Sequence, residues 1–467
     1  MVFSSLEFMF FYLPITLIVY YAAPQKFRNV WLLLISLVFY GWGEPVYVLL
    51  MLFTIAVSYG CGLLQDKFKD NRSISRNFML LAIIVNLAIL AYFKYSNFFI
   101  DNLHMIPALS WLPSVNVELP IGISFYTFQT LSYNIDLYRN DGAVQKNVIS
   151  FGVFAGMFPN LLAGPILRYR DVNEQVMRRK HSVNMFASGV RTFMAGLMKK
   201  LLLANTAGQL WTNIRALPGV QMSALDAWLG VLMFSFQIYF DFSAYSDMAI
   251  GLARMFGFRF LENFNYPYIA RSITDFWRRW HISLSTWFRE YVYIPLGGNR
   301  KGKFKMYRNL AIVWLLTGFW HGASWNYVLW GVYFGILLML EKGFLLKKLE
   351  KLPVAVGHIY ALVAVFFSWW LFTFENIGAG IKHLTYMFGA GGGGLVDSGA
   401  VYTLLHALPL IAIMIIGSTP LPKNLWYKYK DTKFLRIATP VCIVLFMGLC
   451  TAYMVDNTYN PFLYFRF

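Results

Sequence analysis

The sequence predicts an all-α protein that crosses a lipid bilayer many times. Of its 467 residues, 58% are hydrophobic and only 13% are charged, which is about half of the charged fraction of a soluble domain. Many apolar runs approach the roughly 20 residues that an α-helix needs to cross the hydrocarbon core. No stretch has the composition of a soluble domain, so we predict a single membrane domain that covers residues 1–467.

Lysine and arginine divide the loops between the apolar runs into two sets. Basic residues favour the cytoplasmic side of short loops. The loops that we therefore predict to be cytoplasmic are the strongly basic segments 67–76, 168–181, 300–308, 342–351 and 423–436. Segments 102–118, 205–222 and 375–400 contain at most one lysine or arginine each, and we predict that they face outward.

Threading the chain between these loops gives about ten full spans. They are predicted near residues 8–23, 30–42, 46–64, 78–94, 119–138, 183–204, 226–250, 357–374, 401–417 and 437–454. Because ten is even, both termini lie on one side, and the basic turn at 25–28 makes that side extracytoplasmic. The first run lacks a basic leader and a small-residue cleavage site, so we interpret it as a retained span rather than a signal peptide.

Two apolar segments do not fit as simple spans. Segments 148–167 and 309–341 have basic loops at both ends, so each is predicted to enter the membrane and return as a re-entrant helical hairpin with two short arms. The second hairpin breaks at residues 321–324, and the first at 159–160 or 164–165. Non-helical backbone at membrane depth is stable only where protein buries it or where it lines a watery cavity. The alternative for 309–341 is one long tilted helix followed by a basic loop outside.

The cytoplasmic segment between the hairpins is both polar and aromatic. Residues 272–275 offer helix-capping side chains, and the aromatic or apolar residues that follow at helical spacing are Phe276, Trp280, Leu284, Trp287 and Tyr291. We predict one amphipathic helix that lies either in the membrane interface or tucked under the spans, and composition alone favours an anchor at the interface. His281 lies on this helix near the surface and His321 lies at the break of the hairpin, so the two histidines indicate the two ends of a path.

The stretch "FNYPYIARSITDFWRRWHISLSTWFREYVYIPLGGNR", followed by "LTGFWHGASWNYVLWG", resembles the bacterial branch of the membrane-bound O-acyltransferase (MBOAT) family. Within that branch it is most similar to the membrane subunit of alginate O-acetylation and its relatives. The opening "MVFSSLEFMFFYLPITLIVYY" and the segment "PNLLAGPILRYRD" share this likeness, which therefore covers nearly the whole chain.

The resemblance implies a helical fold around a central tunnel and an O-acetyltransferase activity. It makes His321 the catalytic base and His281 the second family histidine, with acetyl-CoA as the cytoplasmic donor. It also implies an extracytoplasmic partner with a serine-esterase-like fold, which acetylates a cell-envelope polysaccharide, and a location in the bacterial inner membrane. The alternatives are a D-alanyl-type transfer to a cell-wall polymer, as in a more distant branch, and a secondary transporter that uses the broken helices.

The residues themselves suit the transfer of an acyl group from a thioester to a hydroxyl. A hydroxyl is a poor nucleophile until a base takes its proton, and burial keeps an imidazole neutral and able to accept one. Ser324 and Asn326 are candidates to orient the His321 ring or to donate to an oxyanion, although capping of the second half-helix explains them equally well.

Coenzyme A carries phosphates, and the candidate residues to bind them are Arg278, Arg279, Arg300 and Lys301. The positive-inside rule and contacts with anionic membrane lipid also explain these charges. The three cysteines have no metal-ligand spacing, and we expect neither a metal nor a nucleic-acid partner.

The chain ends in the aromatic segment "NTYNPFLYFRF", which the charge pattern places outside. It is interpreted either as an aromatic belt that anchors the last span at the interface or as a tail that folds back into the outer mouth of the tunnel. In the second interpretation Tyr464 is a possible acyl relay, since a phenyl ester is activated enough to pass its acetyl group on. The segment weakly resembles the aromatic C-terminal motif of the small partner in teichoic-acid D-alanylation.

Overall fold

A computed structural model describes residues 1–456, 459 and 461. All regular elements in these residues are helices and none is a strand, which confirms the all-α class. Seven helices are long and apolar enough to cross a membrane: Tyr47–Lys67, Arg72–His104, Ala224–Met255, Trp325–Leu349, Val354–Thr373, Ser398–Gly417 and Lys433–Asp456. Each of the ten predicted spans coincides with a helix over most of its length, while the number of crossings stays a prediction.

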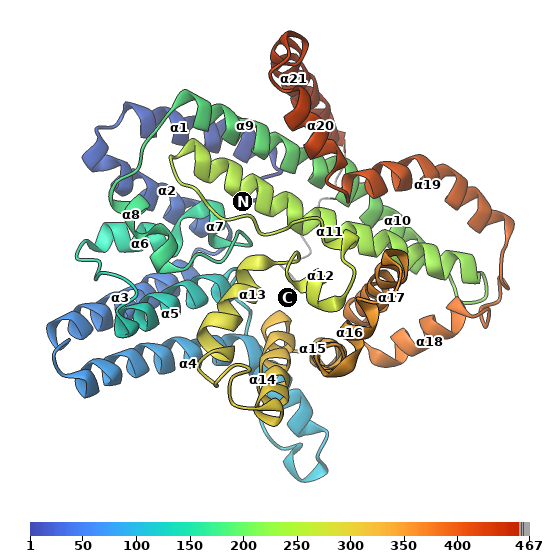
Figure 1. Cartoon of the computed structure of the whole chain (residues 1–467), viewed down its shortest axis with the longest axis horizontal. Coiled ribbons are helices and arrows are strands. Elements are labelled where there is room, and N and C mark those ends of the chain that lie inside the picture. The colour runs from blue at the N-terminus through green and yellow to red at the C-terminus, as the bar shows by residue number, and fades with distance from the viewer. Residues whose placement is uncertain (457–458, 460, 462–467) are drawn as a thin grey trace. The chain divides into compact units, whose positions relative to one another are not determined.

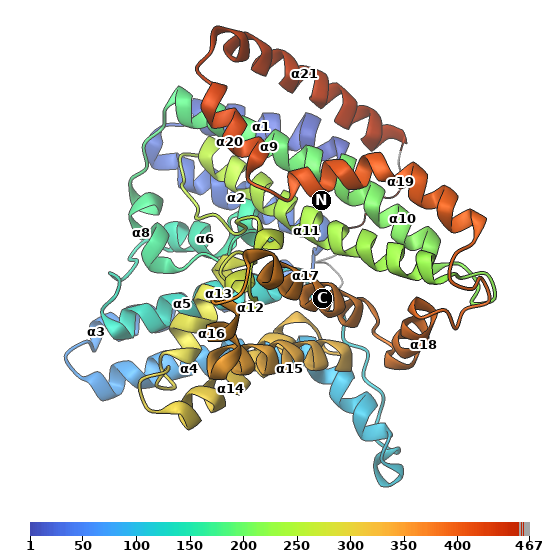
Figure 2. The ribbon, with the colours of Figure 1, turned by 45° about the vertical axis from the view of Figure 1, so that its right-hand side comes forward.

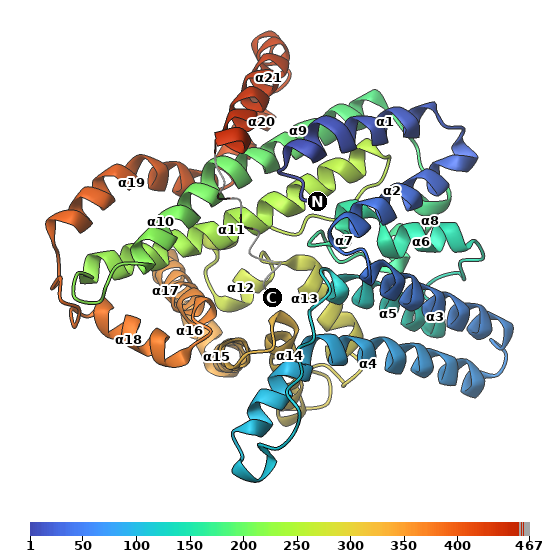
Figure 3. The same ribbon diagram turned by 180° about the vertical axis from the view of Figure 1, so that it is seen from behind.

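The described residues form two compact units, and the single-domain assignment stays a prediction. The first unit comprises Met1–Phe193 and Tyr245–Glu262. Its helices are α1 (Leu13–Ala22, preceded by the π-helical turn Phe8–Tyr12), α2 (Arg28–Gly43), α3 (Tyr47–Lys67), α4 (Arg72–His104), α5 (Ile123–Arg139), α6 (Val148–Gly156), α7 (Phe158–Leu161), α8 (Tyr169–Met177) and the first part of α9 (Val183–Met198). Helices α3, α4 and α5 pack against one another along their lengths (Figures 1 and 3).

Two hydrogen bonds within the first unit involve segments to which the charge pattern assigns a side. Nη1 of Arg28 lies 3.3 Å from Nδ1 of His181, which joins two segments that are both predicted to be cytoplasmic. Nδ2 of Asn97, in α4, donates to the carbonyl oxygen of Val117 at 3.0 Å, in the loop that is predicted to face outward. The sides of the loops and the orientation of the termini stay predictions.

The first predicted hairpin is a broken segment inside the first unit. Helix α6 ends at Gly156, Met157 is extended with φ −64° and ψ 124°, and the short α7 follows with Pro159 in its first turn. The chain is non-helical again from Leu162 to Arg168. Residues 150–167 are all buried, so protein covers the backbone groups that both interruptions release.

The second unit comprises Met194–Ala244 and the described residues from Asn263 onward. Its helices are α10 (Asn205–Arg215), the first part of α11 (Ala224–Met255), α12 (Ile273–Trp277), α13 (Ile282–Phe288), α14 (Lys303–His321), α15 (Trp325–Leu340), α16 (Leu346–Leu349), α17 (Val354–Thr373), α18 (Ile377–Met387), α19 (Ser398–Gly417), α20 (Leu421–Tyr429) and α21 (Lys433–Asp456). In this unit α15 lies between α14 and α17 (Figure 2).

Helices α14 and α15 form the predicted second hairpin, and they pack closely. A Cβ atom on Gly331 would lie 3.0 Å from Cα of Gly318 and 2.4 Å from the carbonyl oxygen of Trp314. Small residues at such a crossing let two helix backbones approach each other inside a membrane. The break falls at Gly322, as predicted, where the backbone is extended.

The second arm of this hairpin is longer than the sequence predicted. It continues from α15 through the π-helical turn Glu341–Leu345 into α16, so that Trp325–Leu349 is one helix of 25 residues. At 1.5 Å per residue it is about 37 Å long and could cross the membrane by itself. The predicted short length of this arm is therefore wrong, while its re-entrant path stays a prediction.

The predicted single amphipathic helix at 276–291 is also wrong, because it is broken in the middle. Helix α12 ends at Trp277 and α13 begins at Ile282, and between them His281 adopts a left-handed backbone with φ +43°. The predicted stripe is nevertheless correct as a set of buried residues, since all five of its side chains are buried. They pack into protein rather than into the membrane interface.

Glu341 explains both the long second arm and the position of α12. Its carboxylate is 1% exposed and accepts hydrogen bonds from the backbone N–H groups of Ile273 (2.6 Å) and Thr274 (2.8 Å) and from the Thr274 hydroxyl (2.6 Å). These N–H groups lie at the start of α12, where the helix itself offers them no acceptor. A carboxylate from the π-helical turn that continues α15 therefore caps α12 and holds it in place.

We expect Glu341→Gln to destabilise the protein by about 2 kcal/mol, because charge-assisted hydrogen bonds to a buried carboxylate are lost or weakened. The measurement is thermal unfolding in detergent, and the control is Glu350→Gln, which neutralises an exposed acid one element further on. Equal melting temperatures for the two variants would show that Glu341 does not hold α12.

Candidate active site

His321 is the last residue of α14 and lies at the break of the hairpin. It is 3% exposed, and its ring is surrounded by those of Trp320 (5.0 Å between centroids), Trp330 (4.7 Å) and Phe372 (5.6 Å). The next residue must be a glycine, because a Cβ atom on Gly322 would lie 2.3 Å from the ring of Tyr327. Three helices, α14, α15 and α17, thus enclose one imidazole.

His281 is completely buried, with 0% exposure, although the sequence placed it near the surface. Its Nδ1 lies 3.2 Å from Oδ1 of Asn263. The backbone N–H and the hydroxyl of Ser283 donate to the same oxygen at 3.1 and 2.9 Å. Since that oxygen only accepts hydrogen bonds, Nδ1 of His281 carries the proton and Nε2 carries the lone pair.

The backbone of His281 is strained in order to hold this ring. A left-handed conformation costs a non-glycine residue about 1–2 kcal/mol, and such outliers gather at functional sites. The N–H of Ile282 donates to the carbonyl oxygen of Asn263 at 2.9 Å, so that the His281 ring and the two residues that follow it are all tied to one asparagine. Asn263 therefore fixes the direction in which the imidazole points.

Trp320 brings the two histidines into one aromatic cluster. Its ring centroid lies 5.7 Å from that of His281 and 5.0 Å from that of His321. Burial lowers the pKa of His281 well below its usual value, and the charge that His321 would carry lowers it further. The two imidazoles are thus close enough for their charges to interact, and both cannot readily be protonated at once.

The four basic candidates for donor binding fall into different surroundings. Arg279 is engaged, since its Nε lies 2.9 Å from Oδ1 of Asp275 and it also donates to the carbonyl oxygen of Asn265. Arg278, Arg300 and Lys301 are exposed. Arg278 lies close enough to Lys342 for their charges to interact, so this end of the unit gathers positive charge.

Ser324 and Asn326 differ in what they contact. Ser324 precedes α15 in an extended conformation, but its side chain makes no capping hydrogen bond. Asn326 is buried, and its Nδ2 donates to the carbonyl oxygen of Phe372 at 2.9 Å. That carbonyl lies in the last turn of α17, where it has no partner within the helix, so Asn326 joins α15 to α17.

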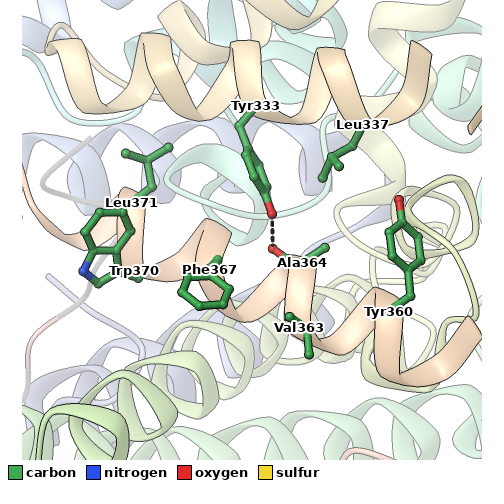
Figure 4. A pocket seen from close by; sticks show the side chains of 8 residues that line it. All are labelled: Tyr333, Leu337, Tyr360, Val363, Ala364, Phe367, Trp370 and Leu371. Carbon is green, nitrogen blue, oxygen red and sulfur yellow. Dashed lines mark hydrogen bonds between the residues drawn. The ribbon is translucent and has the colours of Figure 1, made fainter. Parts of the chain in front are cut away.

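An apolar pocket of about 490 Å³ lies on other faces of α15 and α17 (Figure 4). Its lining residues are Tyr333, Leu337, Tyr360, Val363, Ala364, Phe367, Trp370 and Leu371. The Tyr333 hydroxyl donates to the carbonyl oxygen of Ala364 at 2.9 Å and ties the two helices together. Neither histidine lines this pocket, so it is separate from the candidate active site.

Sequence reasoning missed Asn263 and Glu341, although both position the site. Asn263 precedes the aromatic motif in the chain, and Glu341 is the carboxylate at the end of an otherwise apolar run. The sequence signal that could have identified Glu341 is a single carboxylate directly after a long apolar run. Tyr464, the possible acyl relay, lies outside the described residues, and no three histidine, cysteine or acidic side chains gather as a metal site within the described part of the chain.

Comparisons of the sequence with known proteins point to one family. The model of the membrane-bound O-acyltransferase family matches residues 76–380. A protein named "Probable alginate O-acetylase AlgI" from Azotobacter vinelandii is 38% identical over the full length of both chains. A peptidoglycan O-acetyltransferase from Helicobacter pylori is 31% identical over 100% of this chain and 98% of its own. A teichoic acid D-alanyltransferase from Streptococcus thermophilus is 32% identical over 49% of this chain and 58% of its own.

With a family model that covers most of the chain, relatives that align along all of it, and several helices able to cross a membrane, this protein is a multi-pass membrane O-acyltransferase and belongs to the membrane-bound O-acyltransferase family.

Proposed function

We propose that the protein moves acetyl groups from cytoplasmic acetyl-CoA to an extracytoplasmic polysaccharide, with His321 as the general base. The observation that carries this proposal is a buried imidazole at a helix break, next to a second buried imidazole. The relatives that align along the whole chain are named for O-acetylation, of alginate in one case and of peptidoglycan in the other. The D-alanyl relative aligns with only half of it, which favours acetyl over D-alanyl transfer.

The transfer needs one base, and it neither consumes nor releases a proton overall. His321 takes the proton of the attacking hydroxyl while the hydroxyl oxygen forms a bond to the thioester carbonyl carbon. The carbon–sulfur bond then breaks, and the thiolate of coenzyme A receives the proton from His321. The aromatic rings around the imidazole exclude water, which favours transfer to the acceptor over hydrolysis.

The exposed arginines suit the cytoplasmic end of this path. Coenzyme A carries phosphates, and guanidinium groups bind phosphate through paired hydrogen bonds. Arg278 and Arg300 are the better candidates for this role, because Arg279 is already engaged by Asp275. We further propose that both termini are extracytoplasmic and that a serine-esterase-like partner there receives the acetyl group.

We expect His321→Ala to lower acetyl transfer by about 100- to 10,000-fold, the range typical for loss of a general base. The measurement is release of coenzyme A thiol by the purified protein in lipid nanodiscs. The matched control is His383→Ala, which removes another buried histidine, on α18. Near-normal turnover in His321→Ala would refute the assignment, and uptake of an intact solute without thioester cleavage would favour a transporter.

His281→Gln should have a smaller effect than His321→Ala and should act mainly by raising KM for acetyl-CoA, because the ring is held rigidly beside the base without being the base. Steady-state kinetics separate KM from kcat. Asn263→Ala should reproduce part of the change, since it releases the His281 ring. A loss of kcat as large as that of His321→Ala would instead make His281 part of the proton transfer itself.

Tyr464→Phe keeps the aromatic ring and removes the hydroxyl that a relay needs. If Tyr464 carries the acetyl group, this variant lacks the acceptor hydroxyl. It should then cleave acetyl-CoA no faster than a protein from which residues 462–467 are deleted, and it should fail to acetylate polymer in cells. Deletion of residues 462–467 is the companion variant. Full polymer acetylation by Tyr464→Phe, together with an inactive deletion, would show that the tail docks a partner or gates the tunnel instead.

A further inference from the structure

An ion pair is buried in the second unit beside the start of the C-terminal segment. Nζ of Lys200 lies 2.6 Å from Oδ1 of Asp241, and both side chains are 3% exposed. Lys200 lies on the π-helical turn Lys199–Ala204 that continues α9, and Asp241 lies on α11. Both belong to predicted spans, where charged side chains are costly and usually serve a function.

The ammonium group of Lys200 also holds the C-terminal segment. Its Nζ donates to the main-chain carbonyl oxygen of Pro461. A carboxylate partner alone would be weak evidence for a role, because the desolvation of two buried charges offsets much of their attraction. The contact with Pro461 shows that the charge also serves a segment 261 residues further along the chain.

A second contact holds the same segment one helix away. The hydroxyl of Tyr459 lies 3.1 Å from Oγ1 of Thr212 on α10. The Thr212 hydroxyl donates to the carbonyl oxygen of Gly208 at 2.9 Å, so it accepts the hydrogen bond from Tyr459. A Cβ atom on Gly208 would lie 2.2 Å from Nε2 of Gln237 and 3.0 Å from the Tyr459 oxygen, so the glycine leaves room for both side chains.

We propose that the Lys200–Asp241 pair is the anchor of the C-terminal segment and that Lys200 is a positioning residue for acyl transfer. Asp241 orients the ammonium group, and the ammonium group fixes the chain at Pro461. Tyr464 follows Pro461 by only three residues in the sequence. The anchoring stands on the contacts described above, whereas its consequence for acyl transfer rests on the proposed function of the tail.

The anchoring is tested without any assay of activity. The variant Lys200→Met/Asp241→Leu removes both charges at once, because removal of one member of a buried ion pair is more disruptive than replacement of both by apolar side chains. Digestion of the purified protein in nanodiscs by a carboxypeptidase, followed by intact mass, should remove the last residues at least about tenfold faster than in the unchanged protein, as expected when a local contact is lost. An unchanged digestion rate would overturn the anchor.

Two further variants keep this test decisive. Arg168→Met/Asp171→Leu removes an ion pair of 2.7 Å that does not involve the tail, and it should leave the digestion rate unchanged. Thr212→Val removes the hydroxyl on an exposed position, so it should fold even if the double variant does not, and it should speed digestion by a smaller factor. If Thr212→Val also digests at the unchanged rate, the tail is not held at this place.

The positioning role has a separate readout. Lys200→Met/Asp241→Leu should keep acetyl-CoA binding and lose acetylation of polymer, and deletion of residues 462–467 in that variant should cause no further loss, since both changes remove the same function. If digestion is faster while polymer acetylation is unchanged, the positioning role is refuted and the anchor stands. If the deletion alone has no effect on acetylation, it is the proposed function of the tail that fails.

Discussion

The structure depends on one constraint, which is that a helix can break at membrane depth only where protein satisfies or covers the backbone groups that the break releases. The hairpin of α14 and α15 meets this constraint through α17. Trp330 and Phe372 enclose the end of α14 at His321, and Asn326 uses its amide to satisfy a carbonyl at the end of α17. Two helix ends therefore meet at one place, and the imidazole lies between them.

The same covering sets the electrostatics of the site. Burial lowers the pKa of the His281 imidazole, and the nearby His321, which shares Trp320 with it, lowers it further. His281 is thus held neutral, with its Nδ1 proton directed to Asn263. A neutral ring held in this way keeps its Nε2 lone pair free to accept a hydrogen bond, and it carries no positive charge that would attract an anion.

Much of this fold could be predicted because hydropathy and charge are properties of the chain itself. The positions of the spans, the burial of the stripe from Phe276 to Tyr291, and the break after His321 all follow from residue types in order. The split between α12 and α13 does not, because helical spacing continues through His281 and only the hydrogen bonds to Asn263 favour its left-handed backbone. The length of the second arm was missed for a similar reason. A charged residue after an apolar run predicts the end of a buried helix, and only the hydrogen bonds from Ile273 and Thr274 explain why Glu341 is buried within it.

Two charged side chains that the second unit buries, Glu341 and Lys200, contact the main chain of distant segments in the same way. The Glu341 carboxylate accepts hydrogen bonds from the backbone of α12, and the Lys200 ammonium group donates to the backbone of Pro461. Each partner segment is far away in the sequence and has no apolar span of its own. Apolar contacts alone discriminate poorly between positions along a membrane helix, because lipid is as apolar as the helix surface. A buried charge has a favourable energy only where its few acceptors or donors are in reach, so it fixes one position. The costly residues thus lie where short non-spanning segments, on which the proposed chemistry depends, must be held in register with the spans.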